Sequence, residues 1–419
     1  MPNISFKKAI FLWSLAIIFF AFQFILRLSA GILREEIIQK FAIDAASFGT
    51  LAGYYYLGYA STQIPLGIML DRLSFRFVTA LSIAAAAIGT LLFATTNDWQ
   101  MLLLSRFLIG VGSGVAFLSV AKIIKSCFEA KYHSPMLGFS FSFGLIGAVF
   151  GATPMKYLFD QFGYEYIFHI LALLGFVIAA SILILGKIDR ESTNESIQDT
   201  INSVIRLILN PKIILIGVSG GLMVGSLEGF ADVWAIPFFN QSFDMSKTEA
   251  TTITSFVYMG MCFGGPALTI AATMLRSTNF TIFLTGILTI SIFIVLFYIP
   301  ASYFNFMTSA ALMFFLGILC CYQVLVFIAV SDAVDQNSTG LAIAITQCLN
   351  MSFGHFFHTI IGSTFELSWD GSLTEYGSAL YTHENFIYAL AVIPICCFIG
   401  QFGFMLLAAK SKKAEYIAD

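Results

Sequence analysis

Charged residues are scarce in this chain of 419 residues, where Asp, Glu, Lys and Arg together make up 11% of the sequence. Soluble domains carry roughly 25%. Hydrophobic residues account for 58%, and the mean hydropathy is +0.87. A composition this poor in charge excludes an ordinary soluble domain and indicates a membrane protein. The formal net charge of -3, without a basic tract, gives no sign of a nucleic-acid partner.

Two motifs typical of enzymes are also missing, namely a phosphate-binding Gly-Lys-Ser/Thr loop and a metalloprotease helix. The chain is therefore not expected to be an enzyme, to use ATP or to hold a cofactor. Its seven cysteines lie mostly in apolar segments, without zinc-type spacing, so they are expected to be reduced packing residues and no metal site is predicted. They are Cys127, Cys262, Cys320, Cys321, Cys348, Cys396 and Cys397.

Long apolar runs are what the chain has in abundance. About 20 apolar residues cross a hydrocarbon core of roughly 30 Å, and the sequence holds twelve such runs. Backbone groups inside a bilayer have no water to bond, so each run is expected to be an α-helix. The predicted fold class is all-α, a polytopic membrane protein with spans at 11–33, 46–69, 77–96, 99–122, 135–156, 164–186, 211–238, 249–272, 279–299, 306–330, 338–365 and 384–409.

Basic residues are distributed unequally over the two sides that twelve crossings create. Only Arg34, Lys40, Lys156 and Lys247 fall on the side opposite the termini. Because cytoplasmic loops are enriched in Lys and Arg, both termini are expected to be cytoplasmic, in the inner (plasma) membrane of the cell.

A polar segment, 187–212, separates the first six spans from the last six. The predicted domains are an N-terminal six-helix bundle at 1–188, a cytoplasmic linker at 189–210 and a C-terminal six-helix bundle at 211–419. Ser142-Phe143-Gly144 in span five recurs as Ser352-Phe353-Gly354 in span eleven. Repeated halves with a ligand site between them are a common plan of transporters.

The loop between spans two and three carries Gly67-x-x-x-Asp71-Arg72-x-x-x-Arg76. With this motif the chain resembles the major facilitator superfamily along nearly its whole length, although Ser74 stands where that family usually has Gly. The resemblance implies two pseudosymmetric six-helix bundles and a conformational latch, in which Asp and Arg pair with neighbouring charges or helix ends while Gly permits a close helix approach. The alternative is a solvated loop that only sets topology.

Span four carries Arg106, followed by Gly110, Gly112 and Gly114, and resembles the fourth-span motif of the same superfamily. Glycines at this spacing allow close helix packing in lipid. Arg106 itself has two interpretations, which are snorkelling to the membrane interface and a buried role in proton coupling or gating.

Ionisable residues inside spans are costly and therefore mark candidate functional positions. Arg27 lies in span one, Glu228 and Asp232 in span seven, and His355 and His358 in span eleven. Spans one and seven are equivalent in the two repeats, so the resemblance implies that they face each other across a cavity. Glu228 and Asp232 are four residues apart, on one face of a helix.

Arg27 suits a carboxylate or phosphate because its guanidinium is a planar fork that stays protonated. The stretch around it resembles the organic phosphate and organic anion branches, and the chain has a loose likeness to amino-acid and nucleoside importers of intracellular bacteria. Arginine on one half and acids on the other suit a zwitterion. Glu228 is the first choice for the proton carrier, and the alternative is a structural ion pair of Arg27 with Glu228 or Asp232.

Polar and aromatic side chains in the spans are candidates to line the cavity, and packing or interface anchoring is the alternative for each. The predicted substrate-binding residues are Arg27, Tyr55, Tyr59, Glu228, Trp234, Gln323 and His355. The predicted proton-coupling residues are Glu228, Asp232 and Arg106, and the predicted latch is Gly67, Asp71, Arg72 and Arg76.

The sequence therefore predicts a secondary active transporter of a small polar organic solute, with proton-coupled import of an amino acid or small peptide by alternating access. The alternatives are an organic anion or organic phosphate exchanger or uniporter, and a non-transporting membrane sensor. The expected partners are the substrate, protons and the lipid bilayer, with no nucleic acid, and the chain is expected to be monomeric.

Overall fold

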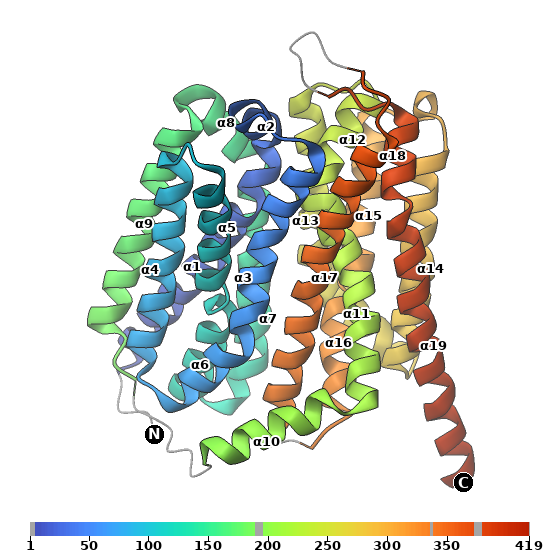
Figure 1. Cartoon of the computed structure of the whole chain (residues 1–419). Helices are drawn as coiled ribbons and strands as arrows, with labels where there is room; N and C mark the ends of the chain where they lie inside the picture. The colour runs from blue at the N-terminus through green and yellow to red at the C-terminus, as the bar shows by residue number, and fades with distance from the viewer. Residues whose placement is uncertain (1–4, 189–195, 336–337, 373–378, 419) are drawn as a thin grey trace. The chain divides into compact units, whose positions relative to one another are not determined.

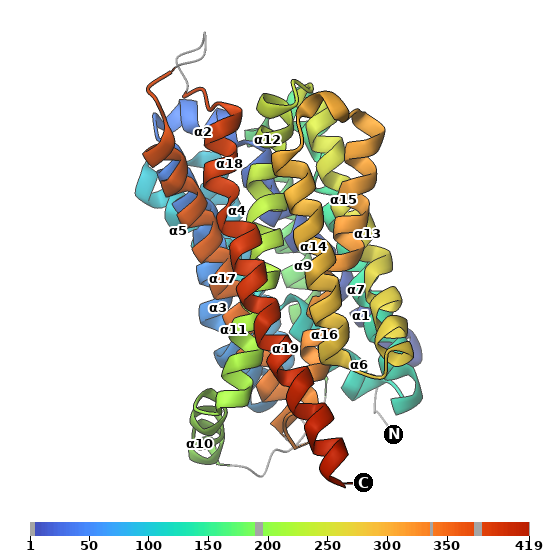
Figure 2. The same ribbon diagram turned by 90° about the vertical axis from the view of Figure 1, so that its right-hand side faces the viewer.

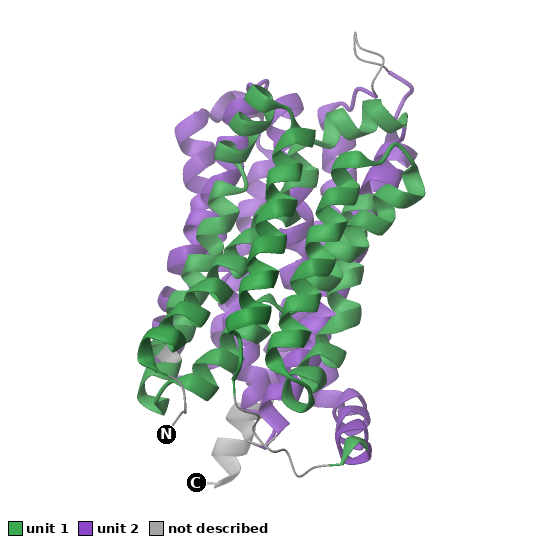
Figure 3. Ribbon diagram, turned by 90° about the vertical axis from the view of Figure 1, so that its left-hand side faces the viewer, with its two compact units in different colours: residues 1–42, 51–197 green, residues 43–50, 198–419 purple. Residues whose placement is uncertain are grey.

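The computed structural model describes residues 5–188, 196–335, 338–372 and 379–418, which are almost entirely α-helical (Figure 1). The chain divides into two compact units, drawn in two colours in Figure 3. Unit 1 comprises residues 1–42 and 51–197, and unit 2 comprises residues 43–50 and 198–419. Of the expected linker, residues 189–195 lie outside the described residues and most of the rest is helical. The all-α fold is as the sequence predicts.

Along its described residues unit 1 contains eight whole helices and most of a ninth, α3, whose first residues, 45–50, belong to unit 2. Within it, α4 packs on α5 and α9, and α1 packs on α6 and α7. The helices are α1 (Phe6–Ile32), α2 (Arg34–Phe41), α3 (Ala45–Arg72), α4 (Phe75–Thr95), α5 (Trp99–Ser113), α6 (Ala116–Cys127), α7 (Ala130–Phe150), α8 (Thr153–Phe162) and α9 (Tyr164–Leu185).

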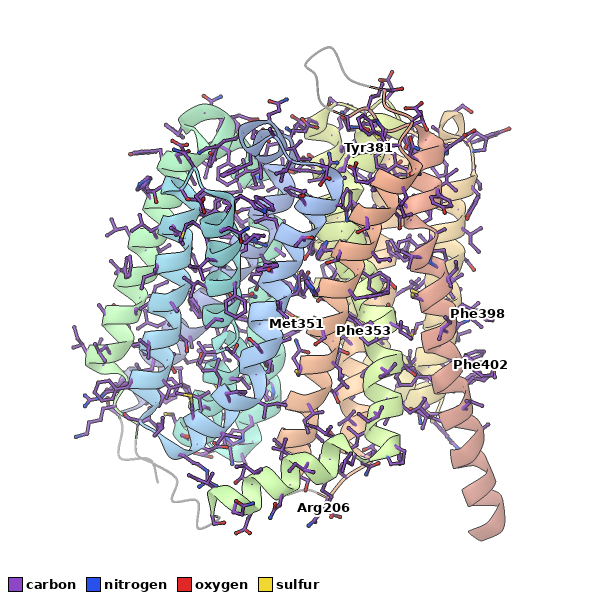
Figure 4. All side chains as sticks on the ribbon, viewed as in Figure 1. Arg206, Met351, Phe353, Tyr381, Phe398 and Phe402 are labelled. Atoms are coloured by element: carbon purple, nitrogen blue, oxygen red, sulfur yellow. The ribbon has the colours of Figure 1, made fainter. Side chains whose placement is uncertain are left out.

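Unit 2 repeats this plan, because α14 packs on α15 and α19 as α4 does on α5 and α9, and α11 packs on α17 as α1 does on α7. Figure 2 shows α14 beside α19, whose Phe398 and Phe402 point away from the bundle in Figure 4 and are 60% and 48% exposed. The helices are α10 (Ile197–Ile208), α11 (Pro211–Gly229), a π-helical segment η1 (Phe230–Trp234), α12 (Ala235–Ser242), α13 (Lys247–Met274), α14 (Thr278–Tyr298), η2 (Ala301–Tyr303), α15 (Phe306–Cys320), α16 (Tyr322–Ser331), α17 (Thr339–Ser368), α18 (His383–Leu390) and α19 (Val392–Ala418).

Ten helical segments of the described chain are long and apolar enough to cross a membrane. The other two predicted spans correspond to α3 and α17, which have 28 and 30 residues but more polar sequences. Together these segments account for the twelve crossings. Large apolar side chains remain exposed on their outer faces, as expected for helices whose solvent is lipid.

Several predicted spans are not single continuous helices, which corrects the expectation of one helix per run. The fourth is divided between α5 and α6 at Gly114, whose carbonyl accepts a hydrogen bond from Gln63 Nε2 at 2.9 Å. The fifth ends earlier than predicted, at Phe150, and α8 begins beyond Gly151 with Pro154 in its first turn. The tenth is divided at Cys321 and the twelfth at Ala391. At Gly114 a side chain satisfies the local backbone, which length and hydropathy do not reveal.

The seventh span contains η1, where the helix widens to a π-turn. Ala235 donates its N–H to the carbonyl of Phe230, five residues earlier. Pro237 follows within the next turn and has no N–H to donate, so the regular α-helical pattern is weakened there. Such π-segments often occur at functional positions in helices, and this one contains Asp232.

Candidate functional site

Arg106 lies within unit 1 and is 2% exposed, so it does not snorkel to the membrane interface. Its Nη1 donates to the carbonyl of Leu26 at 2.9 Å, and its Nη2 donates to the carbonyl of Arg27 at 3.2 Å. Both acceptors belong to α1. The buried guanidinium of Arg106 on α5 therefore binds the backbone of the helix that carries Arg27.

Tyr55 supports this arrangement with the face of its ring. The Arg106 Cζ is 5.2 Å from the centre of the Tyr55 ring, a cation–π distance. The Tyr55 hydroxyl donates to Gln23 Oε1 at 2.6 Å, and the side chain is fully buried. Tyr59 lies next to Tyr55, with ring centres 6.2 Å apart, and is 7% exposed. Tyr55 and Tyr59, both predicted to bind substrate, therefore lie at buried positions packed against other side chains.

Arg27 has a different environment, because its guanidinium is partly exposed and lies among aromatic rings. Its Cζ is 5.0 Å from the centre of the Tyr56 ring and 5.6 Å from that of Phe24. A guanidinium stacks well on aromatic faces, and its planar fork of N–H donors matches the geometry of a carboxylate. This geometry is suited to a planar anion such as a carboxylate.

The predicted latch residues lie at one end of unit 1. Asp71 forms an ion pair with Lys122 Nζ on α6 at 3.0 Å, and Arg72 Nη2 donates to the carbonyl of Ser196 at 2.9 Å. Arg76 Cζ lies 4.7 Å from the Phe77 ring centre. A side chain at Gly67 would meet no described atom within 4 Å, so in this conformation Gly67 does not mediate a close helix approach.

The two acids of span seven are both inside unit 2. Glu228, at the end of α11, is 7% exposed, and Asp232, in η1, is 4% exposed. The Tyr258 hydroxyl on α13 donates to Asp232 Oδ1 at 2.7 Å. Asp232 is therefore a buried acid with a specific tyrosine partner.

The remaining predicted binding residues of unit 2 take part in helix packing. Trp234 is fully buried and stacks on Phe365, with ring centres 4.8 Å apart. Gln323 Nε2 donates to Gln347 Oε1 at 3.2 Å, which joins α16 to α17. His355 on α17 is partly exposed, and His358 is fully buried.

A close contact within unit 2 involves the first turns of α3. Gly49 and Gly362 face each other so closely that a side chain on either would collide with backbone of the other segment. Glu366 Oε1 accepts hydrogen bonds from the Ala45 N–H and the Tyr381 hydroxyl, both at 2.8 Å. A carboxylate at a helix N-terminus is electrostatically favourable, so Glu366 stabilises the start of α3.

Family comparison is consistent with this architecture. The family model described as Major Facilitator Superfamily matches residues 15–359. The chain belongs to this superfamily. It is therefore a membrane transporter and not an enzyme.

Curated relatives within the superfamily match only part of the chain. Probable anion transporter 4, chloroplastic, from Oryza sativa subsp. japonica is 27% identical over 171 residues, which are 39% of this chain and 29% of that protein. Sialin from Ovis aries is 25% identical over 148 residues, which are 35% of this chain and 30% of sialin. Each match thus spans less than a third of the relative.

Solved structures of the superfamily match almost the full length. A bacterial homologue of the human lysosomal transporter Spinster, inward-facing and unoccupied, has a TM-score of 0.77 at 15% identity, covering 97% of this chain and 98% of that one. A point mutant of the nucleoside transporter NupG has a TM-score of 0.74 at 15% identity, covering 94% and 99%. At this identity the likeness establishes the fold alone.

The internal repeat of the superfamily fold is visible in the glycine contacts of each unit. In unit 1, Gly58 and Gly110 bring α3 and α5 so close that a side chain at either would meet a backbone carbonyl of the facing helix within 3.0 Å. In unit 2, Gly260 and Gly317 do the same for α13 and α15. The carbonyl facing Gly110 belongs to Tyr55, and the carbonyl facing Gly317 belongs to Val257.

This correspondence places Tyr56 and Tyr258, each the next residue, at equivalent positions of the two units. Tyr56 lies against the guanidinium of Arg27, and Tyr258 donates to the carboxylate of Asp232. The two halves thus use an equivalent tyrosine to hold side chains of opposite charge, one on α1 and one in the span equivalent to α1.

The predicted site residues included neither Tyr56 nor Tyr258, and sequence reasoning also missed a glycine stripe. The stripe packs α11 against α17, because a side chain on any of its members would meet Leu349, Phe353 or Phe357 within 3.0 Å. A four-residue repeat of small residues is a known packing pattern in membranes, so the stripe was detectable. Its members are Gly217, Gly221, Gly225 and Gly229.

Proposed function

We propose that this transporter is a proton-coupled secondary active transporter of a small organic anion, with Arg27 binding the anionic group of the substrate. The proposal depends on the contacts that fix the position of Arg27. Arg106 binds its backbone carbonyl, and the Tyr56 and Phe24 rings flank its guanidinium. A guanidinium positioned before the substrate arrives loses less side-chain entropy on binding.

Asp232 and Glu228 are the proposed proton carriers. Both are buried carboxylates within a span, where a permanent charge is costly and a proton removes that cost. The Tyr258 hydroxyl gives Asp232 a partner that stabilises the deprotonated form. The proposed cycle takes up the anion at Arg27 and the proton at an acid, then releases both on the other side of the membrane.

One relative supports the substrate class by the name it carries. It is called a probable anion transporter and is 27% identical to this chain over 171 residues. An anionic substrate agrees with the positive charge of Arg27, which is partly exposed and lies within a span.

An amino acid or small peptide is the second candidate. The buried acids Glu228 and Asp232 favour it, because a carboxylate binds the ammonium group that such a substrate carries. The direction of transport is proposed to be import, across the inner (plasma) membrane with cytoplasmic termini. The Asp71–Lys122 pair and the Arg72 contact are proposed to form the conformational latch on that side.

The test uses purified protein in proteoliposomes. A thermal-shift screen of monocarboxylates, dicarboxylates, sugar acids, amino acids, dipeptides and nucleosides selects ligands, and counterflow of labelled ligand then measures exchange. We expect exchange of an organic acid that is lost in Arg27→Gln, and proton-driven accumulation that collapses with a protonophore. Stabilisation by amino acids alone would favour the second candidate, and binding without counterflow would identify a sensor and overturn the proposal.

A further inference from the structure

Helix α10, which follows the first six spans, presents three different faces along its length. Leu207 is buried, and Thr200, Ser203 and Val204 next to it on the helix are partly buried, which makes one face that points into the protein. The two other faces are exposed, and they differ sharply in chemistry.

The apolar exposed face consists of four isoleucines at helical spacing. Their side chains are 62%, 41%, 50% and 40% exposed at Ile197, Ile201, Ile205 and Ile208. Positions four, four and three residues apart lie on one side of a helix. Leu209, just after the helix, is 74% exposed. An isolated exposed isoleucine needs no explanation, but a continuous stripe of them in contact with water is unfavourable.

The polar exposed face lies beside this stripe. Gln198 Nε2 donates to Asn202 Oδ1 at 3.3 Å, and Arg206 continues the same row one turn later. Arg206 points away from the helical bundle in Figure 4. The isoleucine stripe lies on another side of the helix than Arg206.

The junction with α11 sets the direction of α10. Asn210 caps α11 by accepting a hydrogen bond from the Lys212 N–H at 2.9 Å, and Pro211 occupies the first turn. Proline cannot continue a preceding helix, so the chain turns sharply there. In Figure 1 α10 accordingly runs across the end of α11 instead of extending its axis.

We propose that α10 lies in the membrane interface, with Ile197, Ile201, Ile205 and Ile208 inserted among the lipid headgroups and upper acyl chains. An amphipathic helix with an apolar stripe beside a polar face, which here carries Asp199 as well as Arg206, has the form of an interfacial helix. Arg206 and Lys212 are positioned at its edge and end, where they complement anionic headgroups. The partner of this face is the lipid surface, at the end of unit 2 where α11 begins.

The experiment measures lipid proximity residue by residue in the full chain. Single cysteines replace Ile201 and Ile205 on the stripe, and Gln198 and Asn202 on the polar face. Each variant is labelled with an NBD fluorophore and reconstituted in nanodiscs of three parts phosphatidylcholine and one part phosphatidylglycerol. Wild-type protein, labelled in parallel, gives the background from the seven native cysteines. Nitroxide-labelled lipids with the spin near the headgroup or deep in the chain act as quenchers.

We expect headgroup-level nitroxide to quench the labels at 201 and 205 at least twofold more than those at 198 and 202, with weaker quenching by the deep nitroxide. Equal quenching on both faces, or none on either, would overturn the proposal. If a second copy of the protein covered the stripe, energy transfer between labels would grow with protein density. That result would also contradict the proposal. A gel-filtration profile matching wild type establishes that each variant is folded.

Discussion

The side chain of Arg106 donates hydrogen bonds to the carbonyls of Leu26 and Arg27, at 2.9 and 3.2 Å, and so connects the two intramembrane arginines through the backbone of α1. The substrate-facing role proposed for Arg27 depends on this support. Arg106 is thus a positioning residue, which acts on a ligand through α1.

Arg106→Lys is expected to weaken substrate binding about tenfold or more while protein yield stays close to wild type. Lysine keeps the charge but cannot reach two carbonyls with one planar fork. A hydrogen bond to a charged group contributes about 1.5–3 kcal/mol, and about 1.4 kcal/mol corresponds to a factor of ten in affinity. Ligand titration by calorimetry measures the change. Arg276→Lys, at an exposed residue just after α13, is the matched control and should bind as wild type.

Tyr258→Phe is expected to lower proton-driven accumulation several-fold and to preserve counterflow of substrate. The substitution removes only the hydroxyl that donates to Asp232, and leaving a buried carboxylate without this donor costs about 1–3 kcal/mol. The ratio of accumulation to counterflow in proteoliposomes is the measurement. Tyr388→Phe, at a residue 62% exposed, is the control. An unchanged ratio in Tyr258→Phe would argue against a proton-coupling role for Asp232.

Gly110→Ala and Gly317→Ala are expected to lower the melting temperature of the purified protein by several degrees. A methyl group at either position would collide with a backbone carbonyl, of Tyr55 or Val257, and separating the helices costs about 1–3 kcal/mol. Gly67→Ala is the control, because no described atom lies within 4 Å of the added methyl group. There the melting temperature should stay the same or rise, since alanine is about 0.5–1 kcal/mol better than glycine within a helix.

Asp71→Asn and Lys122→Gln are expected to change stability little and transport rate strongly. The Asp71 side chain is 57% exposed, and exposed ion pairs contribute about 0.2–1 kcal/mol. A double-mutant cycle on the melting temperature should give a small coupling, whereas a latch predicts a non-additive effect on the rate of counterflow. Additive effects on that rate would indicate that the pair only sets the charge of the loop.

Much of the fold was predictable because lipid imposes a simple rule on sequence. Runs of about 20 apolar residues must become helices, and the spans predicted at 46–69, 164–186 and 306–330 agree within a few residues with α3, α9 and the pair α15–α16. The breaks within spans were not predictable in this way. At Gly114, for example, the interruption depends on Gln63, a residue distant in the sequence, whose side chain satisfies the backbone.

Candidate residues could be selected from sequence because an ionisable group in a span is costly and rare. That reasoning selected Arg27, Arg106 and Asp232 as candidates. Among the tyrosines it selected Tyr55 and left out Tyr56 and Tyr258, because neighbouring tyrosines on a helix differ only in the direction in which their side chains point, and the sequence does not give that direction.

The sequence by itself determined that this chain is a helical membrane transporter with two repeated halves, since hydropathy, charge asymmetry and the loop motif are local properties of the chain. Only the tertiary structure decided that Arg106 binds the backbone of α1, that Asp232 lies in a π-turn beside Tyr258, and that glycines fix the helix crossings. These are contacts between residues distant in the chain. They depend on helix rotation and depth, which a hydropathy pattern leaves undetermined.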